Sequence, residues 1–257
     1  MVSNVLTSPA NPLLKEIRRA QQQGALTEKG WMIAEGPHLV AEAWRSRLRI
    51  PRAVVSEGAA LPAGVEADRV IEVSDKVFRS ISGTSTPQGV LALVEPKLAS
   101  FPTILSGNPL VVVLDGVQDP GNAGAIARAG EAFGATGIVF LKGSVSPFHP
   151  KTIRASAGSL FRLGIVLATA EETAAAFVGR AAILAGVPHT RGVKSAWDSD
   201  LTRPLAVIIG SEGHGVDPSF LKTAELVSIP TGAVESLNAA VAAGVLLYEA
   251  ARQRASR

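Results

Sequence analysis

The sequence contains no cysteine and few residues of several other kinds. Cysteine is absent from all 257 residues, tyrosine occurs once and methionine twice. Without thiols the chain can form no disulfide, no thiolate zinc or iron–sulfur site and no cysteine nucleophile, which is consistent with a reducing compartment. The four histidines are scattered without ligand spacing, so we expect no metal site.

Long apolar segments and triphosphate-binding motifs are also missing. The longest strongly apolar stretch, Ala239 to Tyr248, is about half of the ~20 residues that a membrane-spanning helix needs. The N-terminal sequence MVSNVLTSPANP lacks the basic and apolar regions of a secretory signal. No Gly-Lys-Ser or Gly-Lys-Thr occurs, which disfavours nucleotide triphosphate hydrolysis. We therefore expect a cytoplasmic protein without a P-loop.

The composition that is present indicates a folded α/β protein. Hydrophobic residues make up 47% and charged residues 18% of the chain, which excludes a highly charged disordered protein. Three regions are expected: a basic leader helix in residues 1–30, a small α/β domain in 31–98 and a larger domain in 108–257. Three prolines, a glycine and an asparagine between Pro96 and Pro109 indicate the linker.

The larger domain is expected to contain a parallel sheet covered by helices on both faces. Short continuous runs of Val, Ile and Leu alternate with helical patterns, as in βα units. The expected strands are 110–115, 137–141, 164–168, 181–185, 205–210 and 226–230, with helices at 122–133, from about 150 to 161 and from 236 to about 252. Ligands of such sheets bind at the carboxyl ends of the strands, so three unusual loops at those ends are the candidate site.

The first loop reads LDGVQDPGNAGAIAR and follows the strand that ends near Asp115. Asn122 is expected to cap the next helix, which carries Arg128 about two turns later and on nearly the same face. An ordinary βα loop with a solvent-facing arginine is the alternative interpretation.

The second and third loops are rich in glycine and in polar residues. IIGSEGHGVDP places three glycines around Glu212, a density that allows close backbone approach to a ligand, although a plain Gly-rich turn is the alternative. It does not match the dinucleotide fingerprint G-x-G-x-x-G. In IPTGAVESLNAAVAAGVLLYE, Ser236 is expected to cap a C-terminal helix; otherwise this is only a tightly packed terminal helix.

Together, NAGAIAR, IIGSEGHGV and IPTGAVESLNAAVAAGVLLYE resemble, in this order, the three signature motifs of the SpoU (TrmH-like) RNA 2′-O-ribose methyltransferases of the SPOUT superfamily. The segment from Trp31 to Glu95 is similar to the small ribosomal-protein-like substrate-binding domain that often precedes them. One departure is Ala240, where the family commonly has serine.

The resemblance implies an α/β fold whose parallel-sheet SPOUT methyltransferase domain holds a trefoil knot, a homodimer, and S-adenosylmethionine as cofactor. Gly210, Gly213, Ile229 and Leu237 match positions that hold this cofactor. The resemblance assigns catalytic roles to Arg128, Asn122, Glu212, Ser236 and Asn238. A guanidinium is a poor simple base, so we expect Arg128 to grip a phosphate and stabilise a developing alkoxide.

Basic residues at two places are the expected RNA contacts. Residues 1–52 contain eight Lys and Arg against four Asp and Glu, a net charge of +4, whereas the whole chain has 25 against 22, or +3. Phosphate contact by the N-terminal end should therefore weaken as salt rises. The expected contacts are Lys15, Arg18, Arg19, Lys151 and Arg154.

Several alternatives stay open at this point. Because histidine as a residue type titrates near neutral pH, His149 and His214 are candidate general bases, and 147–150 either shapes the substrate cleft or forms a rigid turn. Ribosomal RNA is the expected substrate and transfer RNA the alternative. A catalytically inactive RNA-binding or ribosome-assembly module of the same fold is a different class, and a Rossmann dehydrogenase is disfavoured by the absent fingerprint.

Overall fold

The computed structural model describes residues 5–189, 192–211, 213, 215–232 and 234–256, and it divides into two compact units. The N-terminal unit comprises the chain up to Lys97 together with Phe148–Phe161, and the C-terminal unit comprises Leu98–Pro147 and everything from Arg162 onward. The segment 148–161 lies inside the range 108–257 expected for the methyltransferase domain. It packs instead with the N-terminal unit because its apolar side chains are buried in the core there.

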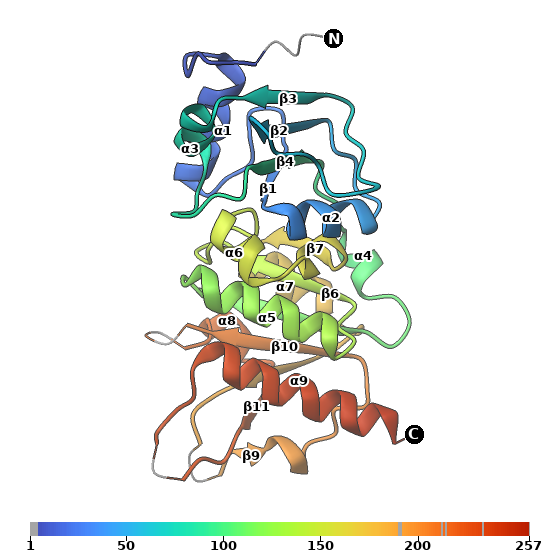
Figure 1. The fold of residues 1–257 in the computed structure, drawn as a ribbon. Coiled ribbons are helices and arrows are strands. Elements are labelled where there is room, and N and C mark those ends of the chain that lie inside the picture. Colours follow the sequence, from blue (N-terminus) through green and yellow to red (C-terminus); the bar gives the residue numbers. More distant parts are fainter. Residues whose placement is uncertain (1–4, 190–191, 212, 214, 233, 257) are drawn as a thin grey trace. The chain divides into compact units, whose positions relative to one another are not determined.

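The N-terminal unit is a four-stranded sheet with helices on both faces (Figure 1). The strand order is β1-β4-β2-β3; β4 is antiparallel to β1 and β2, and β2 is parallel to β3. Its elements are α1 (Pro12–Gln23), β1 (Met32–Glu35), α2 (Pro37–Arg45), β2 (Arg52–Ser56), β3 (Val70–Val73), α3 (Asp75–Ile81), β4 (Val90–Val94), α6 (Pro150–Ala155) and the 3₁₀ helix η1 (Ser159–Phe161).

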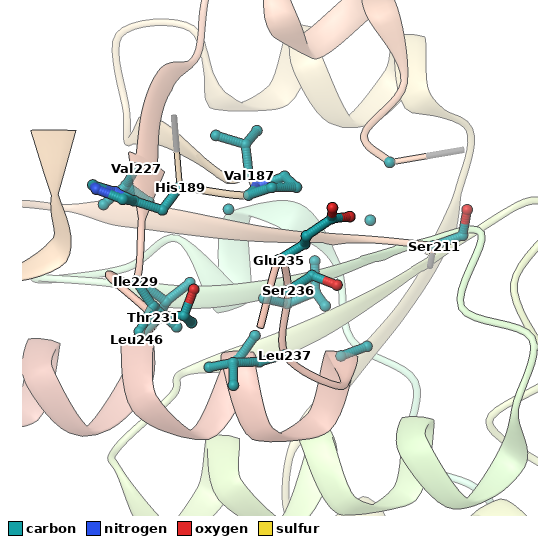
Figure 2. Close-up of a pocket in the computed structure, with 17 residues that line it drawn as sticks. Val187, His189, Ser211, Val227, Ile229, Thr231, Glu235, Ser236, Leu237 and Leu246 are labelled. Atoms are coloured by element: carbon teal, nitrogen blue, oxygen red, sulfur yellow. The ribbon is translucent and has the colours of Figure 1, made fainter. Parts of the chain in front are cut away.

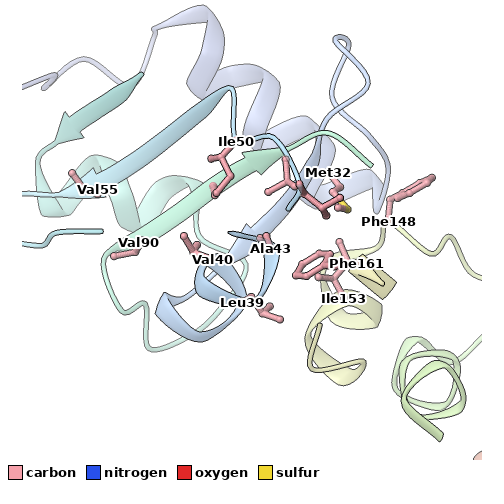
Figure 3. Close-up of a cluster of buried hydrophobic side chains, with 14 residues drawn as sticks. Met32, Leu39, Val40, Ala43, Ile50, Val55, Val90, Phe148, Ile153 and Phe161 are labelled. Carbon is pink, nitrogen blue, oxygen red and sulfur yellow. The ribbon is translucent and has the colours of Figure 1, made fainter. Parts of the chain in front are cut away.

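Alternation along the strands divides the hydrophobic side chains of this unit between two cores. Val54 faces a core formed with α1 and α3, and Val55 faces a core formed with α2 and α6. Figure 3 shows the second core, in which Phe148, Ile153 and Phe161 meet the sheet and α2. The sequentially distant segment 148–161 therefore completes the N-terminal unit.

The leader helix is an integral part of this unit. Asn11 caps α1 by accepting from the backbone N–H of Leu13, and Gly24 ends it in the left-handed conformation at φ 61°. Leu14 and Ile17 are fully buried against the sheet, whereas Lys15 is exposed. Leu14 and Ile17 are about one turn apart, so they lie on one face of α1. The expected helix in residues 1–30 is therefore confirmed.

The helix expected from about residue 150 to 161 is shorter in the structure. α6 ends at Ala155, and the chain turns through left-handed conformations at Ala157 (φ 49°) and Gly158 (φ 93°) before η1. A Cβ atom on Gly158 would lie 2.9 Å from the Cβ of Glu42, so the turn also needs a residue without a side chain. The single-helix prediction was wrong because periodicity alone does not reveal this break.

The C-terminal unit contains a seven-stranded, wholly parallel sheet in the order β7-β6-β5-β10-β8-β11-β9 (Figure 1). Its strands are β5 (Leu110–Asp115), β6 (Gly137–Leu141), β7 (Gly164–Ala168), β8 (Ala182–Gly186), β9 (Lys194–Ser195), β10 (Leu205–Gly210) and β11 (Glu225–Ser228). Its helices are α4 (Phe101–Ile104), α5 (Pro120–Ala132), α7 (Ala170–Phe177), the 3₁₀ helix η2 (Ala196–Asp198), α8 (Pro218–Leu221) and α9 (Ala239–Ala255). The expected parallel sheet is therefore confirmed.

Two helices begin at other residues than expected. α5 starts at Pro120, and Asp119 is its N-cap because the Asp119 carboxylate accepts from the N–H of Asn122 at 2.7 Å. α9 starts at Ala239, and the Asn238 side chain accepts from the backbone N–H groups of Ala240 and Val241, so Ser236 lies before the helix. Asn122 and Ser236 are therefore not the caps.

The end of α9 is anchored by one partly buried cation, Arg254. The Arg254 guanidinium donates to the backbone carbonyls of Asn108, Pro109, Leu201 and Arg203 at 2.7–3.1 Å. Burial lowers the pKa of Arg254, and the four carbonyl acceptors offset that loss of solvation. These bonds tie the terminal helix to the starts of β5 and β10.

No helix in the described part of the chain has the length and apolarity to cross a membrane.

Candidate active site

A cavity of about 240 Å³ lies at the carboxyl ends of β8, β10 and β11, where the sequence predicts the site (Figure 2). Its walls come from the second and third loops, the start of α9 and the loop after β8. The lining residues are Gly186, Val187, Pro188, His189, Ile209, Gly210, Ser211, Gly215, Val227, Ile229, Thr231, Glu235, Ser236, Leu237, Ala239, Ala242 and Leu246. Three segments far apart in sequence therefore enclose one space.

The second loop folds back on itself directly above Gly210. Ser211 and Gly215 each donate their backbone N–H to the carbonyl of the other, at 3.1 and 3.0 Å. A Cβ atom on Gly210 would lie only 2.4 Å from the carbonyl carbon of Gly215. Because the obstructing atoms are backbone, only glycine allows this close approach.

The cavity combines an apolar side with a few polar groups. Ile229, Leu237 and Leu246 group together in Figure 2, and Glu235 and Ser236 lie nearer its middle. Such a lining suits a ligand with a flat apolar part and several hydrogen-bonding groups. The residues present therefore fit the adenosine and amino-acid parts of S-adenosylmethionine.

His189 lines this cavity and was not predicted as a site residue. Its Nδ1 atom is 2.8 Å from the Oγ of Ser228, which in turn donates to the carbonyl of Lys194 at 3.2 Å. The Ser228 hydroxyl therefore links the imidazole of His189 to β9, which carries Lys194. Nothing in the local sequence of His189 indicates this position, because it is set by the pairing of β11 with β8 and β9.

A second cavity, of about 500 Å³, adjoins the first and shares Ser211, Gly215 and Ala239 with it. It is lined further by the first loop, including Asn122, and by the end of β5. At that end Asp115 accepts from the N–H of Asp217 at 2.6 Å.

The Asp115 carboxylate is partly buried in the second cavity. Burial raises the pKa of Asp115 above its usual value, and the hydrogen bond from the Asp217 N–H opposes this shift. The hydrogen bond between Asp217 and Asp115 attaches the second loop to the first at the wall of the second cavity.

Two predicted catalytic residues contact each other across the first and third loops. The Asn238 side-chain amide donates to the Oδ1 atom of Asn122 at 3.1 Å, while Asn238 Oδ1 caps α9. The N-cap of α5 is Asp119, so the Asn122 side chain points to the third loop without acting as the cap of α5. The Asn238–Asn122 hydrogen bond therefore joins the third loop to the first.

A family model described as the SpoU rRNA Methylase family matches residues 109–248. The chain belongs to this family. A second model, described as an MRM3-like substrate binding domain, matches residues 11–92. These matches confirm the family predicted from the three loops, and the expected N-terminal substrate-binding domain ahead of the parallel-sheet fold.

Curated proteins and solved structures resemble this SpoU methylase over nearly its whole length. An uncharacterized tRNA/rRNA methyltransferase of Synechocystis is 34% identical, covering 97% of this chain and 94% of that protein. A 23S rRNA guanosine 2′-O-methyltransferase of Bacillus subtilis is 29% identical, covering 95% and 97%. The crystal structure of an AdoMet-bound rRNA methyltransferase from Sinorhizobium meliloti matches with a TM-score of 0.84 and 31% identity, covering 97% of both chains.

The structure places the predicted site residues of this SpoU methylase in three groups. Gly210, Ile229, Leu237 and Ser236 line the first cavity, and Gly213 and Asn122 line the second. Arg128 is exposed on α5, lines neither cavity, and has no ion pair or hydrogen bond with another described residue. Glu212 and His214 lie outside the described residues.

The predicted RNA contacts all fall in the N-terminal unit, on α1 and α6. The imidazole of His149 packs against Gly24, where a Cβ atom would be 2.2 Å from the ring, so the end of α1 meets the start of α6. Arg154 is partly buried, 3.9 Å from Glu35, and donates to the Gly83 carbonyl at 3.4 Å. Lys151 is exposed.

The other contacts in this group, Lys15, Arg18 and Arg19, lie along α1. Arg18 donates to the Pro9 carbonyl at 2.7 Å, and Arg19 forms an exposed ion pair with Glu28 at 2.7 Å. Such an exposed pair contributes little to stability, so Arg19 can exchange it for a phosphate at small cost.

His149, one of the candidate general bases, has a structural role. Its Nδ1 atom accepts from the N–H of Lys151 at 3.1 Å and so caps α6 in the N-terminal unit. Burial, followed by the charges of Lys151 and Arg154, lowers the pKa of His149. Among the described residues no group of three or more His, Cys, Asp or Glu side chains could hold a metal ion.

Proposed function

We propose that this chain transfers a methyl group from S-adenosylmethionine to the 2′-hydroxyl of a ribose in ribosomal RNA. The observation that carries the proposal is the pair of adjoining cavities, which the three motif loops of the family build together. The first has the lining for the cofactor, and the second opens beside it with Asn122 on its wall. A methyl donor and a hydroxyl acceptor can thereby be held side by side, and such positioning can supply up to about 7–11 kcal/mol of the barrier reduction.

The first cavity holds the cofactor through Gly210, Ile229 and Leu237. Gly210 has no side chain and would leave backbone groups accessible to the cofactor, and the apolar side chains of Ile229 and Leu237 would pack against it. Gly213 lies toward the second cavity, where the acceptor ribose enters. S-adenosylmethionine, when bound, supplies the electrophilic methyl group.

The acceptor side depends on residues of the first and third loops. Arg128 grips the phosphate beside the target ribose and stabilises the oxygen as negative charge develops, because a guanidinium stays protonated and cannot act as a simple base. The Asn122–Asn238 pair orients the groups around the reacting hydroxyl. Glu212 orients Arg128 or the loop amides, and Ser236 contacts the substrate.

The protein acts as a cytoplasmic homodimer whose methyltransferase domain, residues 108–257, contains a trefoil knot. In support of the dimer, α9 exposes Val241, Val245 and Tyr248, with 52%, 38% and 55% of their surface accessible. The ring of Tyr248 packs edge-on against Phe133, the C-cap residue of α5, so the end of α5 and α9 share one apolar face. An exposed apolar face of this kind is typical of a protein interface.

Ribosomal RNA is favoured over transfer RNA because a separate N-terminal unit suits a large structured target. That unit matches a substrate-binding family model and carries the predicted cations on α1 and α6. The Bacillus relative is named for 23S rRNA, whereas the Synechocystis relative is named for tRNA or rRNA. Transfer RNA is therefore the second candidate.

Methyl transfer from tritiated S-adenosylmethionine tests this proposal. Unmodified rRNA and tRNA are incubated with the protein, and nuclease-resistant dinucleotides locate any ribose methyl group. We expect label in 23S rRNA as a 2′-O-methyl nucleotide and little in tRNA. Label confined to tRNA would show that tRNA, and not rRNA, is the substrate. Binding of the cofactor without label in either RNA would favour the inactive RNA-binding module.

A further inference from the structure

The N-terminal unit has a wide groove of about 740 Å³ beside β3, the edge strand of its sheet. Three cations line it, Lys29 from the turn before β1, Arg52 from β2 and Arg69 at the start of β3. Leu13 and Val70 add apolar surface. We call this the edge groove; none of its cations is among the RNA contacts predicted from the sequence.

Ion pairs among the described residues do not neutralise the cations of the edge groove. Lys29, Arg52 and Arg69 form no ion pair among the described residues, and Glu72 is the one acidic residue that lines the groove. By contrast, Arg49 of the same unit binds the carboxylate of Asp68 at 2.8 Å. Unpaired cations gathered in one groove favour an anionic ligand.

A tryptophan holds two of these cations in place. The ammonium of Lys29 lies 5.2 Å from the centre of the Trp31 ring, and the guanidinium of Arg52 lies 5.9 Å from it. Trp31 is half-buried against the core, so its ring is a fixed surface. Contacts of this kind limit the motion of long side chains and reduce the ordering needed when they bind a phosphate.

We propose that the edge groove binds the phosphodiester backbone of the RNA substrate, with Lys29, Arg52 and Arg69 as phosphate contacts. This inference rests on the proposed function, because the RNA is its substrate. The groove is open and its polar lining is mostly cationic, which suits a strand recognised by charge rather than by base sequence. It extends the RNA-binding surface beyond the cations on α1 and α6.

The test is the salt dependence of RNA binding by a triple variant, Lys29→Gln, Arg52→Gln and Arg69→Gln. Loss of three phosphate contacts lowers the slope of log K against log salt by about 2 and weakens binding on the order of 100-fold at about 0.1 M salt. The probe is a fluorescent fragment of unmodified rRNA, with wild-type methyl transfer to the same RNA measured alongside. We expect unchanged affinity for S-adenosylmethionine.

A matched control carries the same charge change outside the groove, at Lys76→Gln, Arg79→Gln and Lys97→Gln, all exposed in the same unit. We expect it to change the slope much less. If the triple variant fails to fold, the single variant Arg69→Gln, at an exposed position, replaces it in the same measurement. Its slope of log K against log salt should then fall by about 0.7.

The proposal is overturned if the triple variant keeps the wild-type slope, or if the control loses as much. The groove cations would then only prevent β3 from pairing with another chain, as charges on edge strands do. If the wild type methylates the RNA and the triple variant keeps the wild-type salt slope, the edge groove is rejected as an RNA-binding site but the proposed function stands. An absence of wild-type RNA binding would reject the proposed function as well.

Discussion

The two units of the molecule display charge and polar groups in different ways. The N-terminal unit has 14 Lys and Arg against 10 Asp and Glu, a net charge of +4, whereas the C-terminal unit has 11 against 12, or −1. In the first unit many cations are exposed on helices and in an open groove, and in the second the motif loops enclose two adjoining cavities. The difference indicates that RNA affinity depends on long-range charge and methyl transfer on short-range fit.

The largest expected effect is a loss of methyl-transfer rate in the C-terminal unit without a loss of cofactor binding. Arg128→Ala should lower kcat about 100- to 1,000-fold, because one charge-stabilising group at the reacting oxygen is removed. Arg128 is exposed and has no described partner, so folding and affinity for S-adenosylmethionine should hardly change. Single-turnover methyl transfer measures the effect, with Arg180→Ala, another exposed arginine of this unit, as control. Near-wild-type transfer would reject the assignment.

The next effect tests the fit of the first cavity. Gly210→Ala places a Cβ atom 2.4 Å from the backbone of Gly215, so the second loop must move. Affinity for S-adenosylmethionine, measured by calorimetry, should fall about 10- to 100-fold, the cost of overpacking, while RNA affinity from the N-terminal unit stays the same.

Gly244→Ala is the matched control for this change, because no atom lies within 4 Å of the added Cβ. If Gly210→Ala binds the cofactor as the wild type does, the close approach at Gly210 does not shape the cavity.

A smaller effect concerns the link between the first and third loops. Asn238→Asp keeps the acceptor that caps α9 but removes the amide that donates to Asn122. We expect kcat to fall about 10-fold, the equivalent of one hydrogen bond, with an unchanged melting temperature. Asn238→Ala should in addition lose about 1 kcal/mol of stability with the cap. Equal activity of Asn238→Asp and wild type would show that the link has no part in catalysis.

The smallest effect belongs to the N-terminal unit alone. Because burial lowers the pKa of His149 below 6.5, the neutral imidazole stabilises the fold above about pH 6.5, and this contribution is lost as pH falls below that value. His149→Asn keeps a capping side chain without a titrating group. Urea unfolding between about pH 7 and pH 5 should show a shallower loss of stability in this variant, and an identical pH dependence would contradict the assignment.

Much of this architecture could be predicted from the sequence because its signals are local. Apolar runs correctly predict β5 and β10, and the helix expected within residues 1–30 is α1. The helix starts were misplaced because Asp119 and Asn122 are both good capping residues, as are Ser236 and Asn238, and only tertiary structure selects one of each pair.

Other features have no local signal at all. From its place in the sequence, the segment 148–161 was expected to belong to the methyltransferase domain. In the structure Phe148 and Phe161 are buried in the core of the N-terminal unit, so the segment belongs to that unit. His189 enters the first cavity through strand pairing, and the edge groove exists only once Lys29, Arg52 and Arg69 meet beside β3. Such positions depend on packing between distant segments, which propensity and periodicity do not describe.

The most direct test of the division between the units is methyl transfer to unmodified rRNA over a salt series, with cofactor affinity measured in parallel. We predict 2′-O-methylation whose KM for RNA rises steeply with salt while the Kd for S-adenosylmethionine stays nearly constant. An absence of RNA methylation, or equal salt dependence of the two constants, would contradict the account.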